Sequence, residues 1–340
     1  MNPAENNHPS SPELIFATMS AYQRSAALKT AIDLDIFTAL GAGATTTSAL
    51  AAKTNASERG LRILCDYLVI LGLVTKEGNR YGLPPDSAAF LDKRSPAYMG
   101  SCVGFLNSSE IKKGFEDLTA AVIHGGSASD AGLAPDWRAW VEFARSMAPM
   151  MAIPAQLLAE RFAAGSGDGA VKLLDIAAGH GLFGIAMARR NPRLEVTALD
   201  WPAVLAVAEE NASKAGAADR YRTLPGSAFE VPFGSGYNMV LLTNFLHHFD
   251  KPTNEGLLRK VHSALAPGGR AIALEFIPND DRVSPPMAAG FSLVMLAGTP
   301  SGDAYTFAEL QQMFRNAGFA RAELHSLAPT PSSVVAAVRD

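Results

Sequence analysis

The chain has few cysteines, no excess of basic residues and no long apolar run. Cys65 and Cys102 are the only cysteines in 340 residues. A pair in apolar surroundings is no disulfide framework, so we expect two reduced structural thiols. The formal net charge of -4 provides no broad basic field for nucleic acid or an anionic membrane. No apolar run reaches the ~20 residues that a membrane span needs. We therefore expect neither nucleic acid nor a membrane as a partner.

The N-terminal segment also lacks the features of a secretory signal. Residues 1–12 are polar and contain proline, without a basic n-region or an apolar h-region, so we expect a cytoplasmic protein. Hydrophobic residues make up 48% of the chain and charged residues 18%, as in globular proteins. Because 340 residues exceed the usual size of one hydrophobic core, more than one domain is expected.

The first hundred residues predict helices followed by a hairpin. Residues 14–40 carry apolar side chains at helical spacing, and Thr and Ser hydroxyls precede a short helix over 49–53. A further helix over 59–71 has capping chemistry at Asn55 or Ser57. Residues 73–83 then predict a β-hairpin that turns at 77–79. This order of elements is typical of a winged helix.

A winged helix suggests DNA binding, but the charges on the helix over 59–71, which would be the recognition helix, argue against it. Glu58, Arg59, Arg62 and Asp66 cancel one another, whereas a helix that enters a groove needs surplus cations for phosphate contacts. We therefore favour packing or dimerisation for residues 1–100.

The periodicity changes after the middle of the chain. Helical patterns continue over 99–162 with breaks near Gly125-Gly126 and Pro135, and residues 165–169 are a glycine-rich hinge. Short β-rich runs then alternate with amphipathic helices, which predicts βαβ units and a parallel sheet. We thus expect an α/β catalytic domain over 165–340, preceded by connecting helices over 101–164 that contribute to the substrate pocket. The expected strands cover 171–176, 194–199, 221–224, 239–243, 271–277, 320–324 and 334–338.

A glycine turn follows the first of these strands. Gly179, Gly181 and Gly184 fit G-x-G-x-x-G, which alone allows either NAD or S-adenosylmethionine. Asp200 ends the next strand and could bind the ribose diol of either ligand. Asp175, ahead of the glycines, would be poorly placed beside a pyrophosphate but can organise a turn facing a phosphate-free zwitterion. The chain also lacks the second mononucleotide half of a dehydrogenase, which favours S-adenosylmethionine.

Three segments carry a family resemblance. The segment from Asp175 to Gly181, the run from Leu199 to Pro202 and the turn Pro267-Gly268-Gly269 look like those of class I S-adenosylmethionine methyltransferases. With the N-terminal winged helix, the chain resembles the small-molecule O-methyltransferases of plant secondary metabolism and bacterial natural-product pathways, from about Leu14 to Val338. The resemblance implies a seven-stranded Rossmann-like sheet, S-adenosylmethionine as methyl donor with S-adenosylhomocysteine as product, no metal, and a homodimer formed through the N-terminal domain.

The resemblance also implies which residues bind the cofactor. The turn at 177–179 would face the methionine moiety, with two alanines where the family commonly has glycine. Asp200 would hold the ribose hydroxyls and Trp201 would lie near the adenine. Ser227 replaces an adenine-binding aspartate of the family, and a hydroxyl is a weaker acceptor than a carboxylate. The implied cofactor residues are Asp175, Ala177, Gly179, Gly181, Asp200, Trp201, Ser227, Ala228, Phe229, Thr243 and Asn244.

A histidine pair follows the fourth strand, and the carboxyl ends of strands are where ligands bind in open α/β sheets. O-methylation requires alignment of acceptor, methyl and sulfur and removal of the acceptor's proton, for which histidine has a suitable intrinsic pKa. The first position of the family's His-Asp-Trp stretch matches His247, which is our candidate base; we expect His248 to be structural. The family implies that Glu275 orients His247. The family's second carboxylate falls on Ala304, so its neighbour Asp303 is a possible substitute.

The acceptor itself is less well specified. A set of flexible and aromatic side chains suggests an apolar or aromatic small molecule; it comprises Met147, Met150, Met151, Phe291 and Met295. Three alternatives remain open: methylation at carbon or other chemistry on the same scaffold, an NAD(P)-dependent oxidoreductase, and a non-catalytic cofactor-sensing regulator.

Overall fold

The computed structural model describes residues 10–129, 139–164 and 170–340. Contacts divide the chain into two compact units, Met1–Val103 and Gly104–Asp340. The first unit ends close to the predicted boundary at residue 100. The connecting helices that we set apart as 101–164 belong almost entirely to the second unit. The predicted hinge at 165–169 and the break at Pro135 lie outside the described residues.

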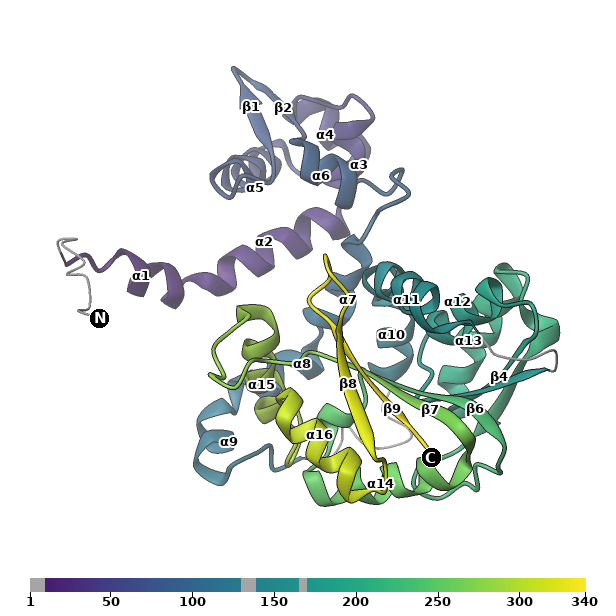
Figure 1. Cartoon of the computed structure of the whole chain (residues 1–340). Helices are drawn as coiled ribbons and strands as arrows, with labels where there is room; N and C mark the ends of the chain where they lie inside the picture. Colours follow the sequence, from purple (N-terminus) through teal and green to yellow (C-terminus); the bar gives the residue numbers. More distant parts are fainter. Residues whose placement is uncertain (1–9, 130–138, 165–169) are drawn as a thin grey trace. The chain divides into compact units, whose positions relative to one another are not determined.

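The first unit contains six helices and a two-stranded hairpin in the part of the chain that the structure describes (Figure 1). The predicted helical region over 14–40 is divided at Ser20 and near Asp35, which has a left-handed φ of 54°. The side chains of Thr46 and Ser57 accept hydrogen bonds from the first turns of α4 and α5 and so fix where these helices begin. The elements are α1 (Glu13–Met19), α2 (Ala21–Asp33), α3 (Ile36–Gly41), α4 (Thr47–Thr54), α5 (Glu58–Ile70), β1 (Thr75–Glu77), β2 (Arg80–Gly82) and α6 (Pro85–Phe90).

The core of this unit is built from the apolar faces of these helices. Leu61, Cys65 and Leu68 of α5 are buried against Leu50 of α4. Cys65 and Cys102 are both buried and form no disulfide with each other, and burial raises the pKa of the Cys65 thiol to about 11. Within the described residues, no helix is long and apolar enough to cross a membrane.

The second unit begins with helices and continues as alternating strands and helices. Gly125, with a φ of 82°, ends α9 at the predicted break. The first helices are α7 (Val103–Leu106), α8 (Ser109–Glu116), α9 (Leu118–His124), α10 (Ala139–Ser146) and α11 (Ala148–Phe162). The later helices are α12 (Leu182–Arg190), α13 (Pro202–Lys214), α14 (Lys251–Ala264), α15 (Pro286–Gly298) and α16 (Phe307–Asn316).

Seven strands form one sheet in the order β5-β4-β3-β6-β7-β9-β8. The pairs β3–β4, β3–β6, β4–β5 and β6–β7 are parallel. Strand β9 runs antiparallel to both of its neighbours, contrary to the simple parallel sheet that we expected. The reason is the short connection from β8 to β9, which allows a hairpin but no crossover helix. The strands are β3 (Val171–Ile176), β4 (Leu194–Asp200), β5 (Tyr221–Pro225), β6 (Tyr237–Thr243), β7 (Leu265–Glu275), β8 (Arg321–Ser326) and β9 (Ser333–Val338).

The sheet buries an apolar layer on each face. Alternate residues of β3 point to opposite sides, so Leu173 joins a core with α11, α12 and α13, whereas Leu174 and Ile176 join a core with α14 and α16. Figure 1 shows the helices on either side of the strands. Strand β7 begins at Leu265 and includes the Pro267-Gly268-Gly269 turn, whereas the predicted strand began after that turn, at residue 271.

Candidate active site

The predicted site residues meet at one edge of the sheet. The parallel strands β3 to β7 end side by side there, which is where ligands bind in this type of sheet. Backbone hydrogen bonds join the segments that follow them. The N–H of Ala178 donates to the carbonyl oxygen of Leu199 (3.1 Å), and that of Asn244 donates to Leu274 (2.7 Å). The sheet topology therefore brings together residues from five separate stretches of sequence.

The turn after β3 contains three left-handed residues. Ala177, Gly179 and Gly181 have φ values of 54°, 57° and 76°. Glycine adopts this conformation freely, whereas Ala177 does so at a steric cost. A Cβ on Gly181 would lie 2.7 Å from the Tyr221 hydroxyl oxygen, so this glycine is also required by the close approach of β5.

Asp175 connects the end of β3 to the helix that follows the turn. Its Oδ2 accepts a hydrogen bond from the N–H of Gly184 (3.1 Å), and a Cβ on Gly184 would lie 2.8 Å from that oxygen. The side chain is completely buried, and this desolvation raises the pKa of the Asp175 carboxyl to about 7. Asp175 thus ties the end of β3 to the first turn of α12.

Asp200 links the turn to the end of β4. Its Oδ2 accepts from the N–H of Gly179 (2.8 Å) and its Oδ1 from that of Trp201 (2.7 Å). Trp201 is the N-cap residue of α13, so Asp200 is not a simple helix cap. Desolvation raises the pKa of the Asp200 carboxyl to about 6. A half-buried carboxylate beside the glycine turn is suited to accept hydrogen bonds from a diol.

The loop after β5 lies next to Asp200. The N–H of Gly226 donates to the backbone oxygen of Asp200 (3.0 Å), and the Ser227 hydroxyl accepts from the N–H of Phe229 (3.2 Å). Ala228 is buried, whereas Phe229 is 42% exposed. The Phe229 ring packs edge-on against Phe249, with centroids 4.9 Å apart. This loop therefore offers an apolar wall beside the Asp200 carboxylate.

At the end of β6, Thr243 is buried and Asn244 has a left-handed φ of 55°. The Asn244 side-chain amide donates to the sulfur of Met151 (3.6 Å) on α11. Its Oδ1 is buried and has no hydrogen-bond partner in the described part of the chain. Because buried acceptors are normally satisfied, this oxygen is suited to a donor on a bound ligand.

His247 and Glu275 form a buried pair. The Nδ1–H of His247 donates to Oε2 of Glu275 (2.5 Å), and both residues are less than 5% exposed. Oε1 of Glu275 accepts from the N–H groups of Phe245 (3.0 Å) and Leu246 (2.8 Å). The carboxylate therefore holds the imidazole through Nδ1, and Nε2 is the ring nitrogen that this contact leaves open.

Asp303 does not take the place of the missing second acid on the imidazole. Its carboxylate forms an ion pair with Arg282 (3.0 Å), and its contact with His247 is a backbone one, from N–H to carbonyl oxygen (3.0 Å). Arg282 also pairs with Glu309 on α16 (2.6 Å). The structure thus connects Asp303 to His247 through its backbone, while its carboxylate pairs with Arg282.

His248 packs between His247 and α10. Its ring centroid lies 4.3 Å from that of His247 and 5.5 Å from that of Trp140. Its Nδ1 donates to the backbone oxygen of Phe245 (3.2 Å). Desolvation by the surrounding rings, together with the neighbouring imidazole, holds the pKa of His248 well below its usual range. These contacts fit the structural role that we predicted.

The residues proposed for the acceptor pocket divide into two groups. The ring of Phe291 on α15 meets that of His247 edge-on at 4.8 Å, so this side chain lies directly beside the base. Met147, Met151 and Met295 are buried, and Met150 packs partly buried against the core. Met151 also contacts the side chain of Asn244 at the end of β6.

Comparison with known families identifies the chain. A model of the O-methyltransferase domain matches residues 121–320, and a model of the O-methyltransferase dimerisation domain matches residues 16–93. The chain belongs to the O-methyltransferase family. It is therefore a methyltransferase, and the methyl donor of this class, S-adenosylmethionine, is the cofactor that the sequence predicted.

Individual relatives agree with this assignment. The chain is 28% identical over 340 residues to 3-hydroxy-5-methyl-1-naphthoate 3-O-methyltransferase of Streptomyces sahachiroi, covering 96% of this chain and 95% of the relative. A crystal structure of a candidate O-methyltransferase from Nostoc punctiforme shares 54% identity and a TM-score of 0.93, with 97% and 100% of the two chains covered. Human N-acetylserotonin methyltransferase in complex with S-adenosylmethionine has the same fold (TM-score 0.84, 19% identity, 98% and 99% covered).

The residues of this O-methyltransferase fit a zwitterionic nucleoside cofactor. Asp200 presents a carboxylate suited to the ribose diol, and the unpartnered Oδ1 of Asn244 fits an ammonium group. No group of His, Cys, Asp and Glu able to hold a metal ion is found among the described residues. A free carbonyl oxygen and a carboxylate are acceptors of the kind that an ammonium group and a ribose diol can use.

Several residues around the site were not predicted from the sequence. Phe143 on α10 stacks over His180 of the glycine turn (centroids 6.3 Å apart), and Trp140 lies against His248. Asn254 on α14 is completely buried and donates from its side chain to the backbone oxygens of Leu246 (2.8 Å) and Phe249 (3.1 Å). An asparagine at a buried helix position was the only sequence signal for this last contact.

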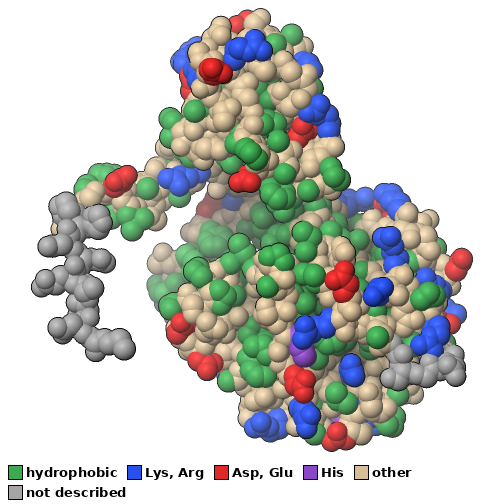
Figure 2. All heavy atoms as spheres, turned by 45° about the horizontal axis from the view of Figure 1, so that its top comes forward, with side chains coloured by type: hydrophobic (Ala, Val, Ile, Leu, Met, Phe, Trp, Pro, Cys, Tyr) green, Lys and Arg blue, Asp and Glu red, His purple; other side chains and the backbone are tan. Residues whose placement is uncertain are grey.

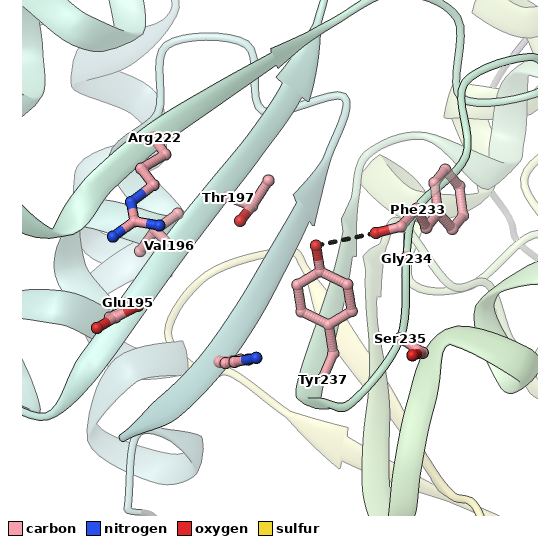
Figure 3. Close-up of a pocket in the computed structure, with 9 residues that line it drawn as sticks. Glu195, Val196, Thr197, Arg222, Phe233, Gly234, Ser235 and Tyr237 are labelled. Carbon is pink, nitrogen blue, oxygen red and sulfur yellow. Dashed lines mark hydrogen bonds between the residues drawn. The ribbon is translucent and has the colours of Figure 1, made fainter.

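A hollow of about 210 Å³ lies away from this site. Its lining includes the early parts of β3 and β4 and residues 233–237, and it contains none of the predicted site residues (Figure 3). The Tyr237 hydroxyl points to the backbone oxygen of Phe233 and donates to it (3.0 Å). We therefore assign the chemistry to the carboxyl ends of the strands and not to this hollow.

Proposed function

We propose that the protein transfers the methyl group of S-adenosylmethionine to a hydroxyl of a small, largely apolar or aromatic molecule, with His247 as general base. The observation that carries this proposal is the buried contact of 2.5 Å between His247 Nδ1 and Glu275 Oε2. The contact holds the imidazole in the tautomer that has a free basic nitrogen, Nε2, which is what a base near neutral pH requires.

The residues of the chain align the reactants and accept a proton. When bound, S-adenosylmethionine supplies a methyl group on a sulfonium sulfur. The sulfur is a good leaving group, because it departs from the methyl carbon as a neutral thioether. His247 Nε2 accepts the proton of the acceptor hydroxyl as the oxygen attacks the methyl carbon. Glu275 stabilises the imidazolium that results, because its carboxylate is already in hydrogen-bond contact with Nδ1. Asp200 would accept hydrogen bonds from the ribose hydroxyls of the cofactor, and Asn244 Oδ1 would accept one from its ammonium group.

The side chains around the base support an apolar acceptor with a ring. Phe291 lies edge-on to His247, and Phe276 packs against Phe291 with centroids 4.6 Å apart. Aromatic walls favour aromatic ligands in offset or edge-on contact. The naphthoate named for the Streptomyces sahachiroi relative is an acceptor of this kind.

The N-terminal unit supports assembly as a homodimer. Its match to a dimerisation domain is accompanied by exposed apolar side chains along α1 and the start of α2, visible in Figure 2. An exposed apolar helix face of this kind marks a protein–protein interface. The exposed side chains are those of Leu14, Ile15, Phe16, Met19 and Tyr22.

Purified protein should be tested with a panel of phenols, naphthols and aliphatic alcohols, and the release of S-adenosylhomocysteine should be measured. We expect methylation of hydroxylated aromatic compounds and loss of most of kcat in His247→Ala. Removal of a general base typically lowers the rate by about 10²–10⁴-fold. Near-normal turnover of His247→Ala would exclude the imidazole as the base.

Methylation at carbon is the second candidate. It is favoured by one observation: Ala304 occupies the position of the family's second carboxylate, and the Asp303 side chain is turned to Arg282. Mass spectrometry and NMR of the product separate the two reactions, because an O-methyl and a C-methyl group differ in chemical shift. A C-methylated product whose formation is unaffected by His247→Ala would support this alternative.

A further inference from the structure

The segment from Gly226 to Gly236 joins β5 to β6 without helix or strand. A loop of this kind pairs only some of its own backbone N–H and C=O groups, and the others take partners from neighbouring elements. We propose that Lys260 of α14 is a positioning residue for the cofactor, which holds this loop in the conformation that receives the adenosine part. The proposal rests on the assignment of the loop to the adenine, and not on the identity of the base or the acceptor.

The ammonium group of Lys260 is bound on three sides by the loop. Its Nζ donates to the backbone oxygen of Ala228 (2.9 Å) and to that of Val231 (2.7 Å). It also lies 4.1 Å from the centroid of the Phe233 ring. Hydrogen bonds from a charged donor are about twice as strong as neutral ones, and the face of an aromatic ring attracts a cation. One side chain therefore fixes three residues of the loop.

Lys260 differs from other lysines that lie on helices of this unit. Lys214 on α13 pairs with Glu210 (2.7 Å), and Lys251 at the start of α14 pairs with Glu309 (2.8 Å). Lys260 forms no ion pair with a carboxylate in the described ranges. Desolvation lowers the pKa of Lys260, because removing the ammonium group from water costs free energy. The hydrogen bonds to the two carbonyl oxygens offset this cost. The charged group therefore stabilises the conformation of the loop.

Hydrogen bonds within the loop leave the backbone oxygens of Ala228 and Val231 available to Lys260. The backbone oxygen of Ser227 accepts from the N–H groups of Glu230 and Val231, and the Ser227 hydroxyl accepts from Phe229. These bonds close a compact turn but leave the backbone oxygens of Ala228 and Val231 for Lys260. The turn lies next to Asp200 through the bond from Gly226, so its conformation decides where the adenosine part is held.

Helix α14 also contacts the segment that contains His247 and His248. Asn254 donates to the backbone oxygens of Leu246 and Phe249, which flank the two histidines. Lys260 follows six residues later, about 9 Å along a helix at 1.5 Å per residue. One rigid helix thus connects the segment that carries His247 to the loop beside Asp200. Through Lys260, the position of the cofactor is coupled to the position of the base.

The experiment is isothermal titration of the full-length protein with S-adenosylhomocysteine and, separately, with adenosine. In Lys260→Met, which keeps the apolar stem and removes the donor, we expect the Kd for both ligands to rise about tenfold, as expected for loss of a charge-assisted hydrogen bond. Lys260→Arg retains donors and should lie within about threefold of the unsubstituted protein. Lys214→Met is the matched control, because that lysine is 68% exposed and pairs with Glu210.

Hydrogen exchange provides a second readout in the absence of ligand. The amides of residues 226–233 should exchange faster in Lys260→Met, whereas those of the β3 turn should not change. If Lys260→Met does not fold, Lys260→Gln is used, since it keeps one shorter donor.

Three results would overturn the proposal. One is an unchanged Kd for S-adenosylhomocysteine in a folded Lys260→Met or Lys260→Gln protein; the second is an equal loss in Lys214→Met. The third is weaker binding of S-adenosylhomocysteine with unchanged binding of adenosine. The outcome is independent of the proposed base, because His247→Ala should abolish methyl transfer while leaving both Kd values unchanged.

Discussion

The Nδ1 atom of His247 lies 2.5 Å from Oε2 of Glu275, and the same carboxylate accepts the N–H groups of Phe245 and Leu246 through its other oxygen. All of these contacts are made at the adjacent ends of β6 and β7, which are paired in parallel up to Thr243 and Leu274. The sheet register therefore sets the position of the carboxylate relative to the imidazole. This geometry allows the tautomer of the proposed base to be tested by a substitution that preserves shape.

Glu275→Gln is expected to reverse the tautomer of His247. The glutamine oxygen can still accept from the two backbone N–H groups, which directs its NH₂ group toward Nδ1. Nδ1 must then accept, so the proton moves to Nε2 and the base is lost. We expect kcat to fall by about 10²–10⁴-fold with little change in the Kd for S-adenosylhomocysteine. Steady-state kinetics and titration calorimetry measure the two quantities, and an unchanged kcat would contradict the assignment of the base.

Ala177→Gly is expected to stabilise the protein. Ala177 has a φ of 54°, and an L-residue in this region costs about 1–2 kcal/mol that glycine does not. Since the unfolded state of glycine is more flexible, we expect a net gain below about 1 kcal/mol, visible as a rise in Tm of at most a few degrees. Ala178→Gly is the control, because Ala178 is buried and lacks the positive φ, and it should lower Tm. A lower Tm in both variants would mean that the turn tolerates Ala177 without strain.

Asp200 predicts weaker cofactor binding at acid pH. Burial raises the pKa of its carboxyl to about 6, so the ligand-free protein carries a proton there at lower pH. Ribose hydroxyls donate to the ionised form, and binding must therefore release that proton. We expect the affinity for S-adenosylhomocysteine to fall as the pH decreases through 6, by about tenfold for each pH unit below it. Calorimetry between pH 5 and 8 measures this slope, which Asp200→Asn should remove together with much of the affinity.

The same pKa shift has the opposite effect on the stability of the ligand-free fold. A carboxyl whose folded pKa lies above its unfolded value stabilises the fold when protonated. Its contribution is complete below pH 3.8, the ordinary pKa, and is lost as the pH rises through about 6. Relative to Asp200→Asn, the free energy of unfolding should therefore decline over this range. A rise over the same range would show that the folded pKa of Asp200 is lowered instead.

The apolar face of α1 predicts a dimer that a charge will dissociate. Phe16 and Met19 are 64% and 69% exposed, and Phe16→Asp together with Met19→Asp places two carboxylates on that face. We expect light scattering after size exclusion to change from the mass of a dimer to that of one chain. Leu324→Asp, on a 44% exposed position of β8, is the control and should leave the mass unchanged. A dimer in the doubly substituted protein would exclude this face as the interface.

Local sequence determined much of the fold. Thr46 and Ser57 begin their helices by capping the first turn, and Gly125 ends another, because these effects depend on neighbours within a few residues. The glycine turn after β3 and the alternation of strands and helices could be predicted from neighbouring residues in the same way. The family resemblance predicted the histidine after β6, because the motif that contains it is contiguous in sequence.

The tertiary structure decided which distant groups meet. The chain alone could not show that Arg282 would pair with the Asp303 carboxylate, because the two residues are 21 positions apart in loops without periodicity. It also gave no signal for Lys260 and the carbonyls of Ala228 and Val231, since hydrogen bonds to backbone oxygens leave no pattern in side chains. The antiparallel direction of β9, by contrast, follows from the short connection after β8, which allows only a hairpin. Local propensity therefore determined the elements, and long-range packing determined the electrostatic partners that give each site residue its role.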